Sequence, residues 1–200
     1  PVSALLHAVA VVKAGVFSFL VVVVYIIGPK YLFESKASDW LIWLASFTIL
    51  ASSIIAISKD DLKARLAYST ISQLSYIILG AALATTFAIK GASFHIITHA
   101  IGKITLFFCA GAIYVTAHVK KISQLNGLGY KTPLIFFAYT LGALSIIGVP
   151  PFVGSWSKFY LILGSLEADY LLVAIIFFTI SSFFLQISGG YLTRSELPSI

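Results

Sequence analysis

Two histidines and a lysine recur at four-residue intervals within one apolar stretch: His95, His99 and Lys103. In a helix, a step of four residues returns to nearly the same face, so the three side chains form a stripe about 12 Å long. Such groups can hold a file of water and pass protons along it, and histidine titrates near neutral pH. The alternative is a polar seam satisfied by neighbouring helices. We favour a proton path because three ionisable groups share one face.

Three of the thirteen basic residues lie inside long apolar blocks, namely Lys13, Lys103 and Lys158. An ionised side chain at the centre of a membrane helix costs about 2.5–3.5 kcal/mol, so such residues usually have a function. Lys13 shares its block with His7, which lies about 120° away around a helix. Lys13 is too deep for its amino group to reach the interface. His7 alone also fits a hydrogen-bonded core histidine.

Lys158 follows a segment that cannot form a continuous helix, Gly148-Val149-Pro150-Pro151-Phe152-Val153-Gly154. Because Pro150 and Pro151 have no N–H, the carbonyls four residues earlier lose their helical partners. Freed backbone groups survive at membrane depth only inside protein or beside water. A broken helix beside an ionisable residue is typical of transporters. The alternative is a proline kink with Lys158 reaching the interface.

No carboxylate is available inside the apolar blocks to pair with these lysines. The seven acidic residues all fall in predicted loops or the C-terminal tail: Glu34, Asp39, Asp60, Asp61, Glu167, Asp169 and Glu196. The lysines therefore have counter-charges outside this segment or spend part of their time neutral, and a lysine that loses and regains its proton is a usable relay. A further polar face either lines a wet seam or serves helix–helix hydrogen bonding. It consists of Ser69, Ser72, Gln73 and Tyr76.

The elements that must position these residues are membrane helices. Hydrophobic residues make up 60% of the 200 positions and charged residues only 10%, against about 25% charged in a typical soluble domain. Six apolar blocks reach the roughly 20 residues that span a bilayer, and none alternates as barrel strands do. We predict an all-α, multi-pass transmembrane helical bundle that forms one domain over residues 1–200. The six spans are about 2–27, 40–58, 66–87, 91–117, 132–165 and 170–190, with the fifth broken near 148–154.

Turn and charge signals separate these blocks. They are Gly28-Pro29-Lys30, residues 59–63, Ile89-Lys90-Gly91, residues 126–129 and Glu167-Ala168-Asp169. Seven basic residues fall on one side of the membrane: Lys59, Lys63, Arg65, Lys120, Lys121, Lys131 and Arg194. Three fall on the other: Lys30, Lys36 and Lys90. The richer side should be cytoplasmic, which places both chain ends there. The chain begins at Pro1 and contains no Met, so we expect a piece of a longer protein.

Several other functions fit the sequence poorly. The net charge of +6 comes from scattered basic residues, so nucleic acid is a poor partner. The one cysteine, Cys109, is expected to be a small buried hydrophobe. A retinal Schiff base would need a membrane carboxylate as counter-ion. A bis-histidine haem would need facing histidines such as His7 and His99, and nothing else supports one. We therefore predict no cofactor and no metal.

Four segments together resemble the antiporter-like proteins of respiratory complex I and of Mrp-type cation/proton antiporters. They run across nearly the whole chain in the family's order. The segments are Pro1–His7 with Val12–Val16, Asp61–Gln73, Phe94–Lys103, and Gly148–Gly154 with Lys158.

The resemblance implies a fold of two inverted repeats, each with one broken helix. This chain would hold the last helix of the first repeat and the whole second repeat, which is half of the antiporter fold. Lys13 matches the lysine that links the two half-channels, and His95, His99 and Lys103 match the polar face of the second. Lys158 matches the ionisable residue of the broken helix. The glutamate–lysine pair of the first half-channel would precede Pro1.

The function implied is a proton-translocating membrane component of a multisubunit cation/proton antiporter, and we favour a protein similar to the D-type component of Mrp antiporters. The alternative is a proton-pumping component of NADH-quinone oxidoreductase or of a related hydrogenase complex. No redox or hydrolytic chemistry lies in the chain itself. The expected partners are the lipid bilayer, other membrane subunits, protons, and Na⁺ or K⁺. The expected location is the bacterial inner membrane.

Overall fold

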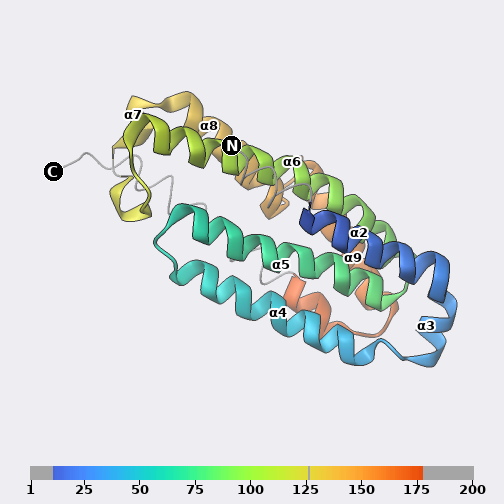
Figure 1. Cartoon of the computed structure of the whole chain (residues 1–200). Coiled ribbons are helices and arrows are strands. Elements are labelled where there is room, and N and C mark those ends of the chain that lie inside the picture. The colour runs from blue at the N-terminus through green and yellow to red at the C-terminus, as the bar shows by residue number, and fades with distance from the viewer. Residues whose placement is uncertain (1–10, 126, 178–200) are drawn as a thin grey trace.

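The computed structural model describes residues 11–125 and 127–177, and this part of the chain is helical without any β-strand (Figure 1). The longest helices are α4 (Asp39–Ser58), α5 (Leu62–Leu83) and α6 (Thr86–Ala117). The other elements are α2 (Val11–Val21), the π-helix η2 (Val22–Ile27), α3 (Pro29–Ser35), the 3-10 helix η3 (Ile122–Gln124), α7 (Leu128–Lys131), α8 (Pro133–Ile147) and α9 (Val153–Glu167). Residues 171–177 are also helical.

Helices α4, α5 and α6 are each long and apolar enough to cross a membrane. A fourth crossing follows if residues 11–27 and α3, which meet at a bend of 83°, count as one span. Figure 1 shows α5 between α4 and α6, with α2 and α9 packed alongside. This position makes α5 the most enclosed of the long helices, so its polar face is available to line an interior site.

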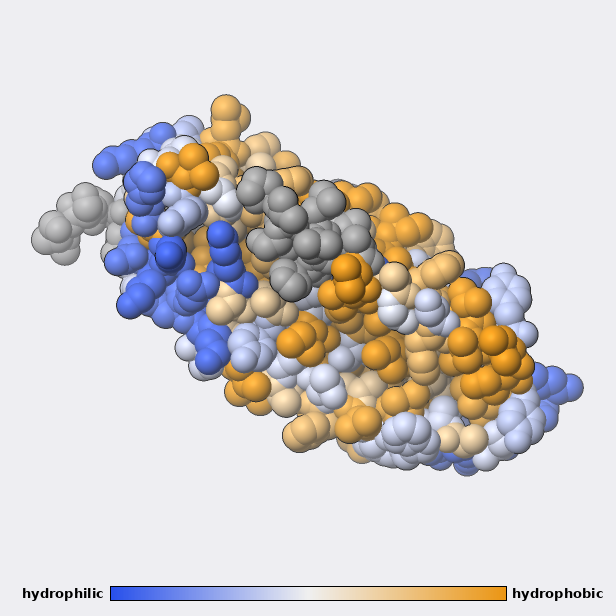
Figure 2. All heavy atoms as spheres, in the orientation of Figure 1, coloured by the Kyte–Doolittle hydropathy of each residue, from blue (hydrophilic) through white to orange (hydrophobic). Residues whose placement is uncertain are grey.

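The outer surface of the bundle is apolar. Large hydrophobic side chains such as Phe47, Ile97 and Leu134 are more than half exposed. Figure 2 shows hydrophobic residues along the middle of the molecule and hydrophilic residues gathered at its two ends. An apolar band with polar ends fits a helical bundle surrounded by hydrocarbon.

The predicted fifth block is interrupted, because α8 ends at Ile147 and α9 begins at Val153. Both helices pack on α6, since a Cβ at Gly142 would lie 3.2 Å from Thr105 and one at Gly164 would lie 2.4 Å from the Ala88 nitrogen. Gly148 ends α8 with φ +84°, a conformation that glycine adopts without strain. Gly154 belongs to α9 rather than to the break.

The turn predicted at Ile89-Lys90-Gly91 is wrong, because these residues lie within α6. The chain turns earlier, at Ala84 and Thr85, and the Thr85 hydroxyl caps α6 by accepting a hydrogen bond from the Ala88 N–H at 3.2 Å. Gly91 is small for another reason. A Cβ there would lie 2.8 Å from the backbone nitrogen of Leu161, so this glycine lets α6 and α9 pack closely.

The sequence predicts a turn at Gly28-Pro29-Lys30 between the spans 2–27 and 40–58, yet Pro29–Ser35 forms α3. Pro29 occupies the first helical turn, where its missing N–H does no harm, and Gly28 makes the bend with φ +87°. The predicted spans 2–27 and 170–190 each extend beyond the described residues, and His7 lies outside them.

Candidate functional site

Five of the six residues expected on the ionisable path lie in the described part of the chain, and all five are buried. Lys13 comes from α2, His95, His99 and Lys103 come from α6, and Lys158 comes from α9. Their exposed fractions lie between 1% and 6%. Helix α2 contacts both α5 and α6, so Lys13 faces the same interior. We call these five residues the buried row.

The side chain of Lys158 is hydrogen-bonded to the backbone at the end of α8, where the helix breaks. Its Nζ donates a hydrogen bond of 2.9 Å to the carbonyl of Ile147. That carbonyl lies four residues before Pro151, so the missing proline N–H leaves it free to accept. The Nζ of Lys158 also lies 5.7 Å from the centre of the Tyr76 ring, within cation–π range. The break therefore supplies the oxygen that holds the buried ammonium group.

A groove of about 600 Å³ reaches Lys158 from the surface. Its walls are mainly apolar and include Pro150, Pro151, Trp156 and Phe159. Trp156 and Phe159 are more than half exposed, whereas Lys158 is 5% exposed. Lys158 thus lines an apolar groove beside the break while its amino group is bonded to Ile147.

His95 is oriented by Ser157, the residue before Lys158. The His95 Nδ1 lies 3.1 Å from the Ser157 hydroxyl, which itself donates to the carbonyl of Gly154 at 2.9 Å. Because the serine proton is used on Gly154, the oxygen must accept from His95, which assigns the ring proton to Nδ1. The Nε2 lone pair of His95 then remains an acceptor.

The rings of Tyr76, His95 and His99 form a stack along the interior. Tyr76 lies 5.6 Å from His95 with an interplanar angle of 24°, and His95 lies 5.8 Å from His99 at 20°. The stack places two titratable rings at successive turns of α6, with the α5 tyrosine at one side. It connects the Lys158 end of the row to the Lys103 end.

Lys103 is held by α5. Its Nζ donates to the Leu66 carbonyl at 3.0 Å and to the Ser69 hydroxyl, and Ser69 donates in turn to Leu66. Lys103 and Lys158 therefore bond neutral oxygens. An ion pair joins Lys30 to Glu34 at 4.0 Å, and both of its side chains are exposed at the surface. Buried ammonium groups without carboxylates are suited to losing a proton.

Several buried polar atoms have no hydrogen-bond partner among the described residues. They are Nζ of Lys13, the side-chain amide of Gln73, Nε2 of His95 and both ring nitrogens of His99. Buried polar groups are nearly always satisfied by protein or by ordered water. The cluster of unpaired donors and acceptors therefore marks a place where water can join the row.

Sequence patterns identified the α6 stripe but missed Ser157, whose signal was its place directly before a buried lysine. From the sequence, the polar face of α5 fits either a wet seam or helix packing, and it consists of Ser69, Ser72, Gln73 and Tyr76. Ser69 and Tyr76 contact the row, whereas Ser72 bonds to Ser53 of α4 at 2.9 Å. Ser72 of this face thus serves helix packing, whereas Ser69 and Tyr76 lie against the buried row.

The model of the NADH:quinone oxidoreductase/Mrp antiporter transmembrane family matches residues 1–184. The chain is 40% identical over 161 residues to NADH-quinone oxidoreductase subunit N of Desulforudis audaxviator, covering 78% of this chain and 32% of that protein. It is 38% identical over 172 residues to NADH-quinone oxidoreductase subunit L of Mycobacterium tuberculosis, covering 84% of this chain and 26% of that one. The chain thus spans about a third or less of these relatives.

Solved structures agree with these sequence matches. The Mrp complex from Dietzia sp. DQ12-45-1b contains a chain with a TM-score of 0.84 and 27% identity, covering 94% of this chain and 34% of that one. Respiratory complex I from Thermus thermophilus gives a TM-score of 0.81 at 21% identity over 93% of this chain and 39% of that one, a likeness of fold alone. The chain belongs to the NADH:quinone oxidoreductase/Mrp antiporter transmembrane family and is an antiporter-like integral membrane protein.

Proposed function

We propose that this chain is the second half-channel of a proton-translocating subunit, and that the buried row carries the protons. The observation that carries the proposal is the set of buried lysines and histidines bonded only to neutral oxygens or left unpaired among the described residues. Such groups change charge more readily than groups locked to carboxylates. Water beside Gln73 and His99 would connect them.

In this proposal each residue has a distinct role. Lys158 and Lys103 store protons at the two ends of the histidine stack. His95 and His99 pass protons between them, with Ser157 fixing the tautomer of His95. Lys13 links the row to the half-channel that would precede this segment, and His7, outside the described residues, is proposed to assist it.

Coupling between the lysines would move protons onward. Two positive charges about 8 Å apart repel each other by about 2 kcal/mol at an effective dielectric near 20. This energy corresponds to more than one pKa unit, so a proton arriving at one site favours release from the next.

We further propose six spans with the fifth broken between α8 and α9, both ends in the cytoplasm, and an inner bacterial membrane as location. Six described basic residues lie at the end where α5 begins, and three lie at the opposite end. This asymmetry supports a cytoplasmic position for the richer end. The arrangement corresponds to half of an inverted-repeat antiporter.

For the whole complex we favour an Mrp-type cation/proton antiporter, in which this chain would be part of the D-type component. The Dietzia structure supports it at 27% identity. The second candidate is NADH-quinone oxidoreductase, which the relatives from Desulforudis audaxviator and Mycobacterium tuberculosis support at 40% and 38% identity. Inverted vesicles distinguish the two, because Na⁺ or K⁺ alone drives a pH change through an antiporter and NADH drives it through the oxidoreductase.

The experiment that tests the proton path uses the complete protein in its complex. Lys158→Ala and Lys103→Ala should abolish the ion-dependent pH change in vesicles while leaving the complex assembled on native gels. Lys158→Arg should fail as well, because arginine keeps its charge and does not release its proton. Lys90→Ala, an exposed lysine of α6, is the matched control. Wild-type rates in Lys158→Arg would show that a fixed charge suffices, and the relay would be withdrawn.

A further inference from the structure

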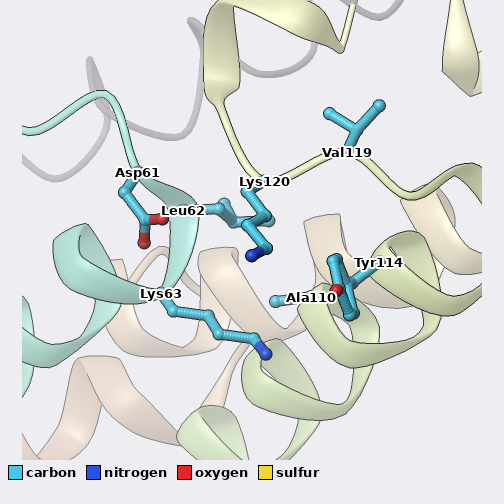
Figure 3. A pocket seen from close by; sticks show the side chains of 7 residues that line it. All are labelled: Asp61, Leu62, Lys63, Ala110, Tyr114, Val119 and Lys120. Atoms are coloured by element: carbon cyan, nitrogen blue, oxygen red, sulfur yellow. The ribbon is translucent and has the colours of Figure 1, made fainter.

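A second polar site lies outside the buried row, at the end of the molecule where α5 begins and α6 ends. It is a pocket of about 250 Å³ formed between the first turn of α5, the last turns of α6 and the segment after α6. Figure 3 shows Lys63 and Lys120 extending from two different segments toward Tyr114. The proposed proton path does not use any of these three side chains.

The pocket holds two lysine side chains and one carboxylate, that of Asp61. The Nζ atoms of Lys63 and Lys120 each lie 5.2 Å from the centre of the Tyr114 ring. Among the described residues, neither amino group has a carboxylate within 4.0 Å. Asp61 lines the same pocket, but its carboxylate accepts the Ala64 N–H at 2.8 Å and caps α5. Two like charges thus converge on one ring, and the Asp61 carboxylate in the same pocket compensates one of them without pairing directly with either amino group.

The pocket walls are held by backbone hydrogen bonds between the two segments. Leu62 N–H donates to the Lys120 carbonyl at 3.0 Å, and Ile122 N–H donates to the Asp60 carbonyl at 2.8 Å. These bonds fix the start of α5 beside residues 119–122, so both lysines start from defined positions. The N-terminal end of the 22-residue helix α5 adds partial positive charge on the same side.

The pocket lies near the end of α6, where we expect the headgroup layer of a bilayer. Helix α6 has 32 residues, which corresponds to about 48 Å, whereas the hydrocarbon layer is about 30 Å thick. Tyr114 lies in the last turn of α6, and tyrosine is enriched at this interface. This end also carries six basic residues against Asp60 and Asp61, which attracts anionic lipid. The basic residues are Lys59, Lys63, Arg65, Lys120, Lys121 and Lys131.

We propose that Lys63, Lys120 and Tyr114 bind the phosphate group of an anionic lipid. The two ammonium groups pair with phosphate oxygens, and the tyrosine lies beside the headgroup. Lysine binds phosphate as a point charge, so two lysines from separate segments can hold one group from two sides.

The test measures acetylation of individual lysines, by mass spectrometry, in the complete complex reconstituted in nanodiscs. In phosphatidylglycerol nanodiscs, Lys63 and Lys120 should react several-fold more slowly than in phosphatidylcholine nanodiscs. Lys59 and Lys121 lie at the same end outside the pocket and serve as internal controls. Equal slowing of all four lysines would show surface charge alone and overturn the site. Equally slow labelling already in phosphatidylcholine, whose headgroup carries a phosphate but no net charge, would show that the pocket does not select an anionic lipid and would overturn the proposal as well.

Variants of Lys63 and Lys121 test whether one phosphate protects both Lys63 and Lys120, or whether each lysine is protected independently. In phosphatidylglycerol, Lys63→Gln should restore fast labelling of Lys120, whereas Lys121→Gln should not, and Lys63→Arg should keep Lys120 protected. Unchanged protection of Lys120 in Lys63→Gln would refute the shared site. Inorganic phosphate added to phosphatidylcholine nanodiscs distinguishes a lipid phosphate from a free phosphate ion as the bound group. Protection that appears there, and not with chloride at equal ionic strength, would assign the pocket to a free ion and overturn the lipid.

Discussion

At the scale of single residues, the three buried lysines differ in what holds them. Lys158 bonds the Ile147 carbonyl that the proline break leaves open, and Lys103 bonds the Leu66 carbonyl and the Ser69 hydroxyl. Lys13 has no hydrogen-bond partner among the described residues. Each amino group therefore has a different set of oxygens around it. Because hydrogen bonds to a charged group change its pKa, neighbouring relay sites can differ in proton affinity.

Ser69 and Ser72 provide a matched pair of variants on one face of α5. Ser69→Ala removes one of two oxygens bonded to Lys103, and a hydrogen bond to a charged group is worth about 1.5–3 kcal/mol. We expect proton transport in vesicles to fall about tenfold. Ser72→Ala removes bonds to Ser53 and to the Ile49 carbonyl of α4. It should lower thermal stability by about 1 kcal/mol and leave transport intact. Equal transport losses in both would contradict a specific role for Ser69.

At the scale of helices, glycines and prolines decide where the chain bends, and their sequence signals are ambiguous. Gly28 and Gly148 have positive φ and do end helices, as their neighbouring prolines indicate. Gly91 instead lies within α6 against the Leu161 backbone, so the predicted turn was misplaced. A turn glycine and a packing glycine look alike in sequence, because the difference depends on a helix more than sixty residues away.

Gly154 and Gly111 test this distinction directly. A Cβ at Gly154 would lie 1.8 Å from the Ser145 carbonyl oxygen, so Gly154→Ala must push α8 and α9 apart at the break. We expect at least a fivefold loss of transport and a lower melting temperature of the purified complex. Gly111 has no atom within 4 Å of its Cβ position. Gly111→Ala should be neutral or stabilise the helix by about 0.5–1 kcal/mol. Normal stability and transport in Gly154→Ala would contradict the close contact.

At the scale of the whole molecule, the sequence predicted an apolar exterior and a polar interior, because lipid as solvent imposes that pattern on each helix separately. It placed His95, His99 and Lys103 on one face because a step of four residues returns to nearly the same side of a helix. It did not predict the Ser157–His95 bond or the position of Tyr76 in the ring stack, which depend on how three helices pack. The lysine–tyrosine pocket was missed as well, since its parts come from segments that meet only in the folded chain.

The arrangement of the long helices makes a prediction about sidedness. The loop before α5 and the segment after α6 are bonded together, so Lys121 lies at one end, whereas Lys36 precedes α4 at the other. In the complete protein with Cys109 replaced by alanine, Lys36→Cys should react with a membrane-impermeant maleimide in intact cells. Lys121→Cys should react only in inverted vesicles, because the lysine-rich end is expected in the cytoplasm.

A third cysteine variant distinguishes a position buried in the bilayer from a position exposed on one side of it. Ile97 is 61% exposed in the middle of α6, so its exposed face should contact hydrocarbon or another apolar membrane helix. Ile97→Cys should therefore resist the reagent from both sides. Reaction of Lys36→Cys and Lys121→Cys from one side would contradict antiparallel crossing by α4 and α5. The reverse pattern would overturn only the orientation, because the crossing follows from the helices and the orientation from the charges alone.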